Sequence, residues 1–139
     1  MSFKLWMSSL LATFAFAQAQ AGSIETGIYH ARDLEGGEIQ AEIKLNEDKT
    51  VLFRLATPDF VMPAPGCTGT YEVQGHDLAA TLSCPNEGID SLNVILDITN
   101  VTPESVRSEE GARVDVIIDL LGSEPMPFKV KKVEAPVFP

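Results

Sequence analysis

Apolar and polar residues alternate along most of the chain after residue 21, which is the pattern of β-strands with one buried face. In the segment 39–45 the odd positions are apolar and the even positions are polar, and the same period continues through 49–56. The register that keeps the two apolar faces together pairs Leu45 with Val51 through a three-residue turn. In that turn Lys49 takes the left-handed conformation usually given to glycine, which costs about 1 kcal/mol.

The alternation predicts eight strands and no amphipathic helix of useful length. The expected segments are 26–34, 39–45, 49–56, 67–74, 77–84, 92–98, 114–120 and 128–133. Prolines interrupt the stretch 57–66, so we expect a loop without strand pairing there. Thr102 and Pro103 are typical of a helix start and predict one helical turn. The fold class is therefore all-β, an antiparallel meander closed into a small barrel, with a two-sheet β-sandwich as the alternative.

A β-hairpin between Cys67 and Cys84 has a register that can be counted from its turn. If Gly75-His76 is a two-residue loop, Tyr71 faces Ala80 and the two cysteines face each other. They fall on a non-hydrogen-bonded pair, where side chains approach most closely. Cys67 and Cys84 are the only cysteines in the chain, and we expect them to form a disulfide on the buried face, which they share with Tyr71 and Val73.

The N-terminus has the layout of a cleavable signal peptide. Lys4 precedes an apolar run, and the small-residue site Ala19-Gln20-Ala21 follows it. The apolar run is too short to span a bilayer. We therefore expect a signal peptide over 1–21 and a single β-barrel domain over 22–139. A periplasmic or secreted location also agrees with the predicted disulfide.

The formal net charge is −10, and all the acidic residues follow the predicted signal peptide. Nucleic acids and anionic membranes are bound by clustered lysine and arginine, so neither is an expected partner. The one basic cluster, Lys129, Lys131 and Lys132, is interpreted as a set of solvent-facing residues on the last strand. No membrane span is expected.

No set of residues in the sequence predicts catalysis. A hydrolase would need a nucleophile, a base and an orienting group together, and the only histidines, His30 and His76, fall in a strand and in a tight turn. We therefore expect no enzyme, and no catalytic residues.

Metal and cofactor sites are not expected either. Asp115 and Asp119 lie too far apart along one strand to share an ion. A soft copper site built from Met62, Met126 and His76 lacks the close methionine spacing that such sites use.

The apolar loop Phe60-Val61-Met62 is the main candidate for binding. It has two interpretations, a lid over an end of the barrel or a lip that binds a ligand or a partner. If the strand order is sequential, the connections 57–66 and 99–112 are expected to flank the same opening.

Two stretches resemble small secreted lipocalin-like barrels, namely 43–50, with its Asp-x-Thr turn, and 69–78, with its Gly-x-Tyr hairpin. The resemblance implies the barrel fold. The copper-homeostasis lipoproteins of that group carry a lipidated cysteine and a Cys-x-x-Cys. Both are missing here, so their metal chemistry is not transferred to this chain.

These observations give two hypotheses. The first is an exported, non-catalytic binding module that holds an apolar small molecule or a protein partner at one end of the barrel. The second is an inhibitor or assembly factor that docks a secreted enzyme or an envelope protein through its loops. A third, a hydrolase that depends on His30 or His76, is not expected.

Overall fold

Strands account for most of the chain that the structure describes. The computed structural model describes residues 23–57 and 59–135, so the predicted signal peptide lies outside the described residues. The strands are β1 (Gly27–Arg32), β2 (Ala41–Leu45), β3 (Thr50–Thr57), β4 (Phe60–Val61), β5 (Cys67–Gln74), β6 (Asp77–Cys84), β7 (Ile89–Asp97), β8 (Ala112–Ile118) and β9 (Met126–Val133). Three short 3₁₀ helices join them: η1 (Pro85–Glu87), η2 (Ser105–Arg107) and η3 (Asp119–Leu121).

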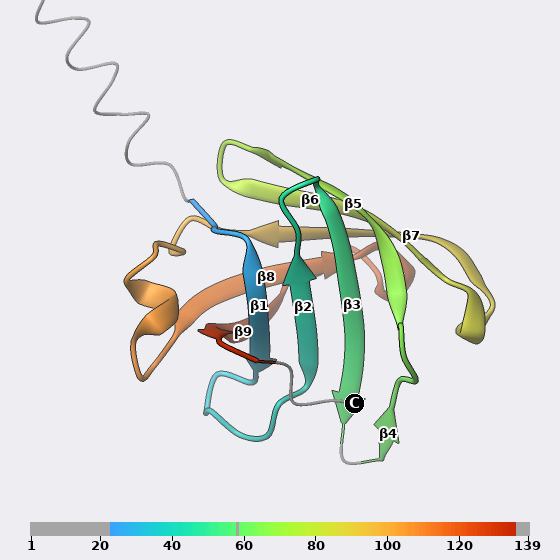
Figure 1. Cartoon of the computed structure of the whole chain (residues 1–139). Helices are drawn as coiled ribbons and strands as arrows, with labels where there is room; N and C mark the ends of the chain where they lie inside the picture. Colours follow the sequence, from blue (N-terminus) through green and yellow to red (C-terminus); the bar gives the residue numbers. More distant parts are fainter. Residues whose placement is uncertain (1–22, 58, 136–139) are drawn as a thin grey trace, which may run out of the picture.

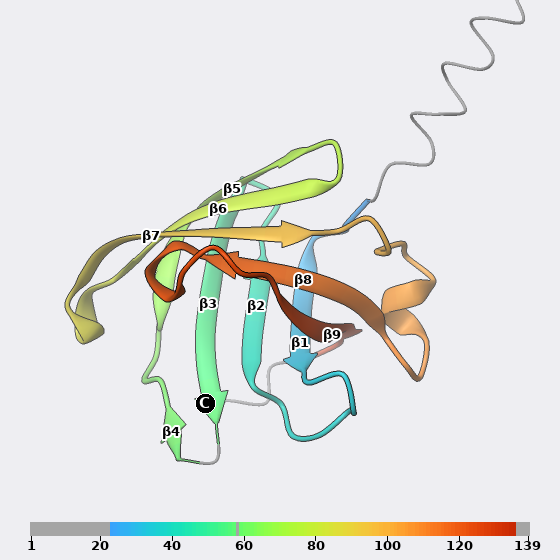
Figure 2. The ribbon, with the colours of Figure 1, turned by 180° about the vertical axis from the view of Figure 1, so that it is seen from behind.

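Eight of these strands form a closed antiparallel barrel. Their order around the barrel is β2, β1, β9, β8, β7, β6, β5 and β3, and a pairing between β2 and β3 closes the ring. The ninth strand, β4, pairs only with the end of β3, outside the ring. In Figures 1 and 2 the strands β1, β2 and β3 cross β6, β7 and β8 steeply, so the barrel is flattened into two crossing layers.

This architecture confirms the barrel and not the sandwich alternative. Each strand except β4 pairs with its neighbours in the ring, and pairing of the first strand, β1, with the last, β9, removes the open edges that a two-sheet sandwich would keep. The closed eight-stranded ring is consistent with a lipocalin-like fold.

The hairpin of β2 and β3 has the expected register. Leu45 pairs with Val51 and Ile43 pairs with Phe53. Lys49 has a φ of 71°, which confirms the left-handed conformation at this position. Its ammonium nitrogen lies 5.4 Å from the centre of the Tyr71 ring, so a cation–π contact offsets part of the backbone strain.

The hairpin of β5 and β6 also forms as expected. Tyr71 pairs with Ala80, and Cys67 and Cys84 form a disulfide with Cα atoms 4.3 Å apart. The backbones approach so closely at Gly69 that a Cβ there would collide with the carbonyl oxygen of Thr81. Tyr71 is buried, and its hydroxyl donates a hydrogen bond to the Asn46 carbonyl at 3.1 Å. In the Gly-x-Tyr motif, Gly69 therefore lets β5 and β6 approach closely, and Tyr71 joins this hairpin to the hairpin of β2 and β3.

Three local predictions were wrong. Residues 60–61 form β4, because the prolines flank this pair and leave its backbone free to pair with β3. The strand β8 ends at Ile118, and Leu120 lies exposed in η3. Val73 was expected on the buried face but is exposed, because β5 extends beyond its last pairing with β3, at Thr70.

The two long connections lie at opposite ends of the barrel, against expectation. Residues 59–66 follow β3, whereas 98–111 follow β7. In this antiparallel ring β3 and β7 run in opposite directions, since two strands, β5 and β6, separate them. The connections 33–40, 59–66, 85–88 and 119–125 share one end, here called the open end. Residues 23–26, 46–49, 75–76 and 98–111 share the other, here called the sealed end.

The sealed end is closed by apolar side chains from the 98–111 connection. Ile98, Val101 and Val106 are fully buried there. Thr102 and Ser105 hydrogen-bond each other's backbone N–H at the start of η2, at 3.0 and 2.8 Å, so the connection is held in one shape. The core of the protein therefore lies toward this end.

The residues before β1 join the same end. The Arg107 guanidinium donates to Glu25 at 2.8 Å, and this hydrogen bond holds the pKa of the Glu25 carboxyl below its usual value. The Ser23 N–H donates to the Val101 carbonyl at 3.1 Å. These contacts hold the segment before β1 against the connection.

Candidate ligand cavity

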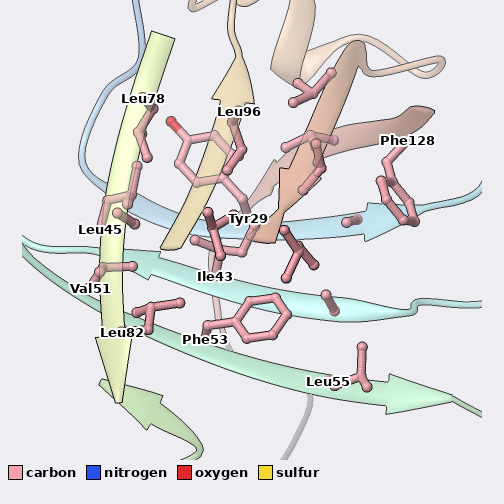
Figure 3. A pocket seen from close by; sticks show the side chains of 18 of the residues that line it. Tyr29, Ile43, Leu45, Val51, Phe53, Leu55, Leu78, Leu82, Leu96 and Phe128 are labelled. Carbon is pink, nitrogen blue, oxygen red and sulfur yellow. The ribbon is translucent and has the colours of Figure 1, made fainter. Parts of the chain in front are cut away.

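The inward-facing residues of the strands surround an apolar cavity of about 110 Å³. Figure 3 shows their side chains pointing into a common space between the two crossing layers of strands. Its walls are Ile24, Tyr29, Ala31, Gln40, Ala41, Ile43, Leu45, Val51, Phe53, Leu55, Leu78, Ala80, Leu82, Val94, Leu96, Val114, Val116, Ile118, Phe128 and Val130.

The cavity walls carry almost no polar chemistry. Among the described residues, no Asp, Glu, Lys, Arg or His side chain lines it, and the polar side chains are those of Gln40 and Tyr29. The Tyr29 hydroxyl donates a hydrogen bond to the Glu25 carbonyl at 2.7 Å. Burial raises the pKa of Tyr29 to about 12, so this side chain is neutral at physiological pH. The cavity can therefore hold apolar groups and offers no charge.

Burial falls along single strands toward the open end, which locates the mouth. On β3, Val51 is 3% exposed and Leu55 is 36% exposed, although both face inward. On β8, Val114 is buried, whereas Val116 and Ile118 are only partly buried. Inward-facing apolar residues become accessible only where the barrel interior opens to solvent. The cavity therefore opens where β3 and β8 end.

Small residues in the walls leave the space unfilled. Ala31, Ala41 and Ala80 all line the cavity, from strands β1, β2 and β6. Each takes an inward position, where leucine or valine would occupy more of the interior. Sequence reasoning placed Ala41 and Ala80 on inward faces, left the facing of the first strand and of Ala31 open, and did not identify the three alanines as a site. The signal was the presence of alanine at positions whose neighbours along the strands are larger.

The predicted binding loop does not line this cavity. Phe60 and Val61 are 44% and 53% exposed on the outer strand β4, at the open end, and Met62 is buried. The Arg54 guanidinium donates to the Met62 carbonyl at 2.9 Å, and the Met62 sulfur lies 3.8 Å from the Cys67 sulfur. Of the three predicted residues, Phe60 and Val61 are therefore exposed, whereas Met62 is buried. A binding role for Phe60 and Val61 stays a prediction.

The two histidines lie in different settings. His30 is buried on the outer face of β1, and its Nε2 lies 2.9 Å from a carboxylate oxygen of Glu42 on β2. His76 is exposed in the turn between β5 and β6, where its carbonyl accepts the Ile98 N–H at 2.7 Å. Sequence reasoning did not foresee the buried His30–Glu42 pair, because it falls on the polar face of both strands.

The acidic residues considered for a metal serve local contacts. Asp119 accepts hydrogen bonds from the backbone and side chain of Asn93, at 3.2 and 3.0 Å, and so fixes η3 to β7. Asp115 lies opposite Asp97 on the neighbouring strand. Within residues 23–57 and 59–135, no three His, Cys, Asp or Glu side chains are grouped closely enough to hold a metal ion.

These features define an eight-stranded β-barrel with an apolar cavity that opens at one end. Comparisons with models of known protein families, with curated proteins and with solved structures found no match. The disulfide fits an oxidising location such as the periplasm or the extracellular space. Across the described part of the chain, no helix has the length and apolar character needed to cross a membrane.

Proposed function

We propose that this chain is an exported, non-catalytic binding protein that holds a small apolar molecule inside its barrel. The observation that carries the proposal is the cavity, with apolar walls and a mouth at one end only. Burial of apolar surface from the ligand and from partly exposed wall residues such as Phe53 and Leu55 would drive binding. The disulfide supports the exported location.

The volume limits the size of the molecule. Apolar cavities of about 150 Å³ bind benzene, whereas pockets for drug-sized ligands measure roughly 300–1,000 Å³. A cavity of about 110 Å³ therefore suits a small ring or a short alkyl chain. A longer ligand would leave part of its length outside the mouth.

Two neighbouring alanines on β6 provide a direct test. Ala80 lines the cavity, whereas Ala79 is exposed on the outer face. We expect the exported, oxidised protein to bind benzene or hexanol in calorimetric or NMR titrations. Ala80→Leu should abolish binding by filling the cavity, and Ala79→Leu should leave it unchanged. Binding by a folded Ala80→Leu variant at the level of the native protein would contradict this site.

A second candidate function is docking of a secreted or envelope protein through the open-end loops, as an inhibitor or assembly factor. The observation that favours it is the exposure of four large apolar residues there, Phe60, Val61, Leu120 and Leu121, since exposed apolar residues on loops tend to mark contact sites.

The docking function is tested by pull-down from envelope extract. Met62 is unsuitable for substitution because it is buried, so the variant is Phe60→Ser with Val61→Thr. This variant should lose the partner, and Ala79→Leu serves as the surface control. Equal recovery by all three proteins would exclude docking through β4.

A further inference from the structure

We propose that the cavity selects against anionic ligands, so that its natural ligand is a neutral apolar molecule or one with a cationic head. This inference rests on the proposed binding function and adds the charge of the molecule that is bound. Two independent features carry it, the chemistry of the cavity walls and the charge of the loops at the open end.

The walls hold no group that would neutralise an anion. Among the described residues that line the cavity, Gln40 offers the only side-chain amide, and no lysine, arginine or histidine is present. The Tyr29 hydroxyl already donates its hydrogen bond to the Glu25 carbonyl. An ionised carboxylate moved from water into such surroundings loses its hydration without gaining a charged partner. A carboxylate would therefore be held outside, at the mouth.

The mouth itself repels anions. The β1–β2 connection carries Asp33, Glu35 and Glu38 and has no lysine or arginine. The other connections at the open end, 59–66, 85–88 and 119–125, contribute four more acidic residues and no basic ones. Carboxylates on the connections at the end where an apolar cavity opens produce a negative potential that lowers the local concentration of anions and raises that of cations.

The nearest basic residues do not reverse this potential. Arg32, Arg54 and Lys129 lie near the open end at outward-facing positions, alternating with the inward residues of their strands. The Arg32 guanidinium donates to the Gly37 carbonyl at 2.8 Å, and the Arg54 guanidinium donates to the Met62 carbonyl. The two guanidinium groups are thus bonded to carbonyls of the open-end connections, none of the three cations lines the cavity, and the seven acidic residues outnumber them.

Three probes with six carbon atoms each test the inference: 1-hexanol, hexylammonium and hexanoate, titrated at pH 7 and low ionic strength. We expect hexanol to bind most tightly, and hexanoate to bind at least about tenfold more weakly than hexylammonium. Hexanoate binding as tightly as hexylammonium would overturn the selectivity while leaving the binding function intact. Failure of all three, hexanol included, would overturn the binding function and this inference with it.

Charge reversal at each end provides the matched control. Glu35 and Glu38 are exposed at the open end, and Glu109 and Glu110 are exposed at the sealed end. Replacing both residues of a pair by lysine changes the net charge equally. The Glu35→Lys/Glu38→Lys protein should bind hexanoate about threefold more tightly, and added salt should remove the gain. The Glu109→Lys/Glu110→Lys protein should resemble the native one. Equal gains in both variants would contradict a role for the mouth.

Discussion

The two ends of the barrel are built from the same alternating strands but differ in what covers them. At the sealed end the inward residues Tyr29 and Val51 are almost completely buried, and so are the apolar residues Ile98, Val101 and Val106 of the 98–111 connection. At the open end Phe53 and Leu55, on the same strand as Val51, keep contact with solvent. The connections there leave Phe60, Val61, Leu120 and Leu121 exposed, and none of these four residues lines the cavity. Connections, and not strands, therefore decide which end of this barrel is open.

The largest expected effect on stability comes from shortening a buried side chain of the 98–111 connection, which closes the sealed end. Ile98 is fully buried, so Ile98→Ala should lower the free energy of unfolding by about 2–5 kcal/mol. Leu55 is already 36% exposed, and Leu55→Ala should cost less than about 1.5 kcal/mol. Urea denaturation of both variants measures the difference. Equal losses of stability would mean that the two ends are equally well packed and would contradict the difference between them.

A disulfide stabilises the open end, whereas packing of apolar side chains stabilises the sealed end. Cys67 begins β5 and Cys84 ends β6, so the disulfide lies at the open end. The double variant Cys67→Ala/Cys84→Ala should lose about 3 kcal/mol of stability, the value expected for a loop of this length. Reduction should destabilise the native protein similarly and leave the double variant unaffected. A native protein that unfolds at the same urea concentration with and without reductant would contradict this division of roles.

The sealed end should also be the more sensitive to alkaline pH. Burial raises the pKa of Tyr29 to about 12 from 10, so the folded state keeps a proton that the unfolded state releases between these values. Its contribution is fully present below pH 10 and is lost as pH rises toward 12. Tyr29→Phe removes this titration, at the cost of the hydrogen bond to Glu25.

Thermal unfolding at pH 8 and pH 11 checks the alkaline prediction. The melting temperature of the native protein should fall more between pH 8 and pH 11 than that of the Tyr29→Phe variant. Both proteins share the titration of their lysines, so the comparison isolates the tyrosine. Identical losses would show that the hydroxyl is not kept protonated by burial.

The smallest effect is expected in the turn between β2 and β3, at the sealed end. Lys49→Gly relieves a left-handed backbone and loses the contact with the Tyr71 ring, so we expect a gain of less than about 1 kcal/mol. Glu47→Gly, in the same turn but without a positive φ, should be slightly destabilising. Chemical denaturation at equilibrium resolves the two. A loss of stability in Lys49→Gly would mean that the ring contact outweighs the backbone strain.

Much of the strand framework could be predicted from neighbouring residues. The pairings Leu45–Val51 and Tyr71–Ala80 and the disulfide followed from turn length and a two-residue period, because both are local. The β4 strand and the early end of β8 were missed because two-residue pairings and 3₁₀ turns leave almost no periodic signal.

The candidate site was the weaker prediction. The sequence pointed to Phe60, Val61 and Met62 by their apolar character in a loop, but it did not show that Met62 is buried beside the disulfide. Nor did it indicate that the alanines of three different strands leave a cavity. The position of a loop end relative to the barrel axis depends on strands far away in the chain.

By itself, the sequence determined the inward face of most strands, which strands pair as hairpins and that two sulfur atoms meet, since each depends on contacts within about twenty residues. Only the tertiary structure decided that the interior is partly empty and open at one end. An empty volume is set by the spacing of side chains on different strands. The strands β3 and β8, which carry the lining residues Phe53 and Ile118, come to enclose one space only after the barrel has closed.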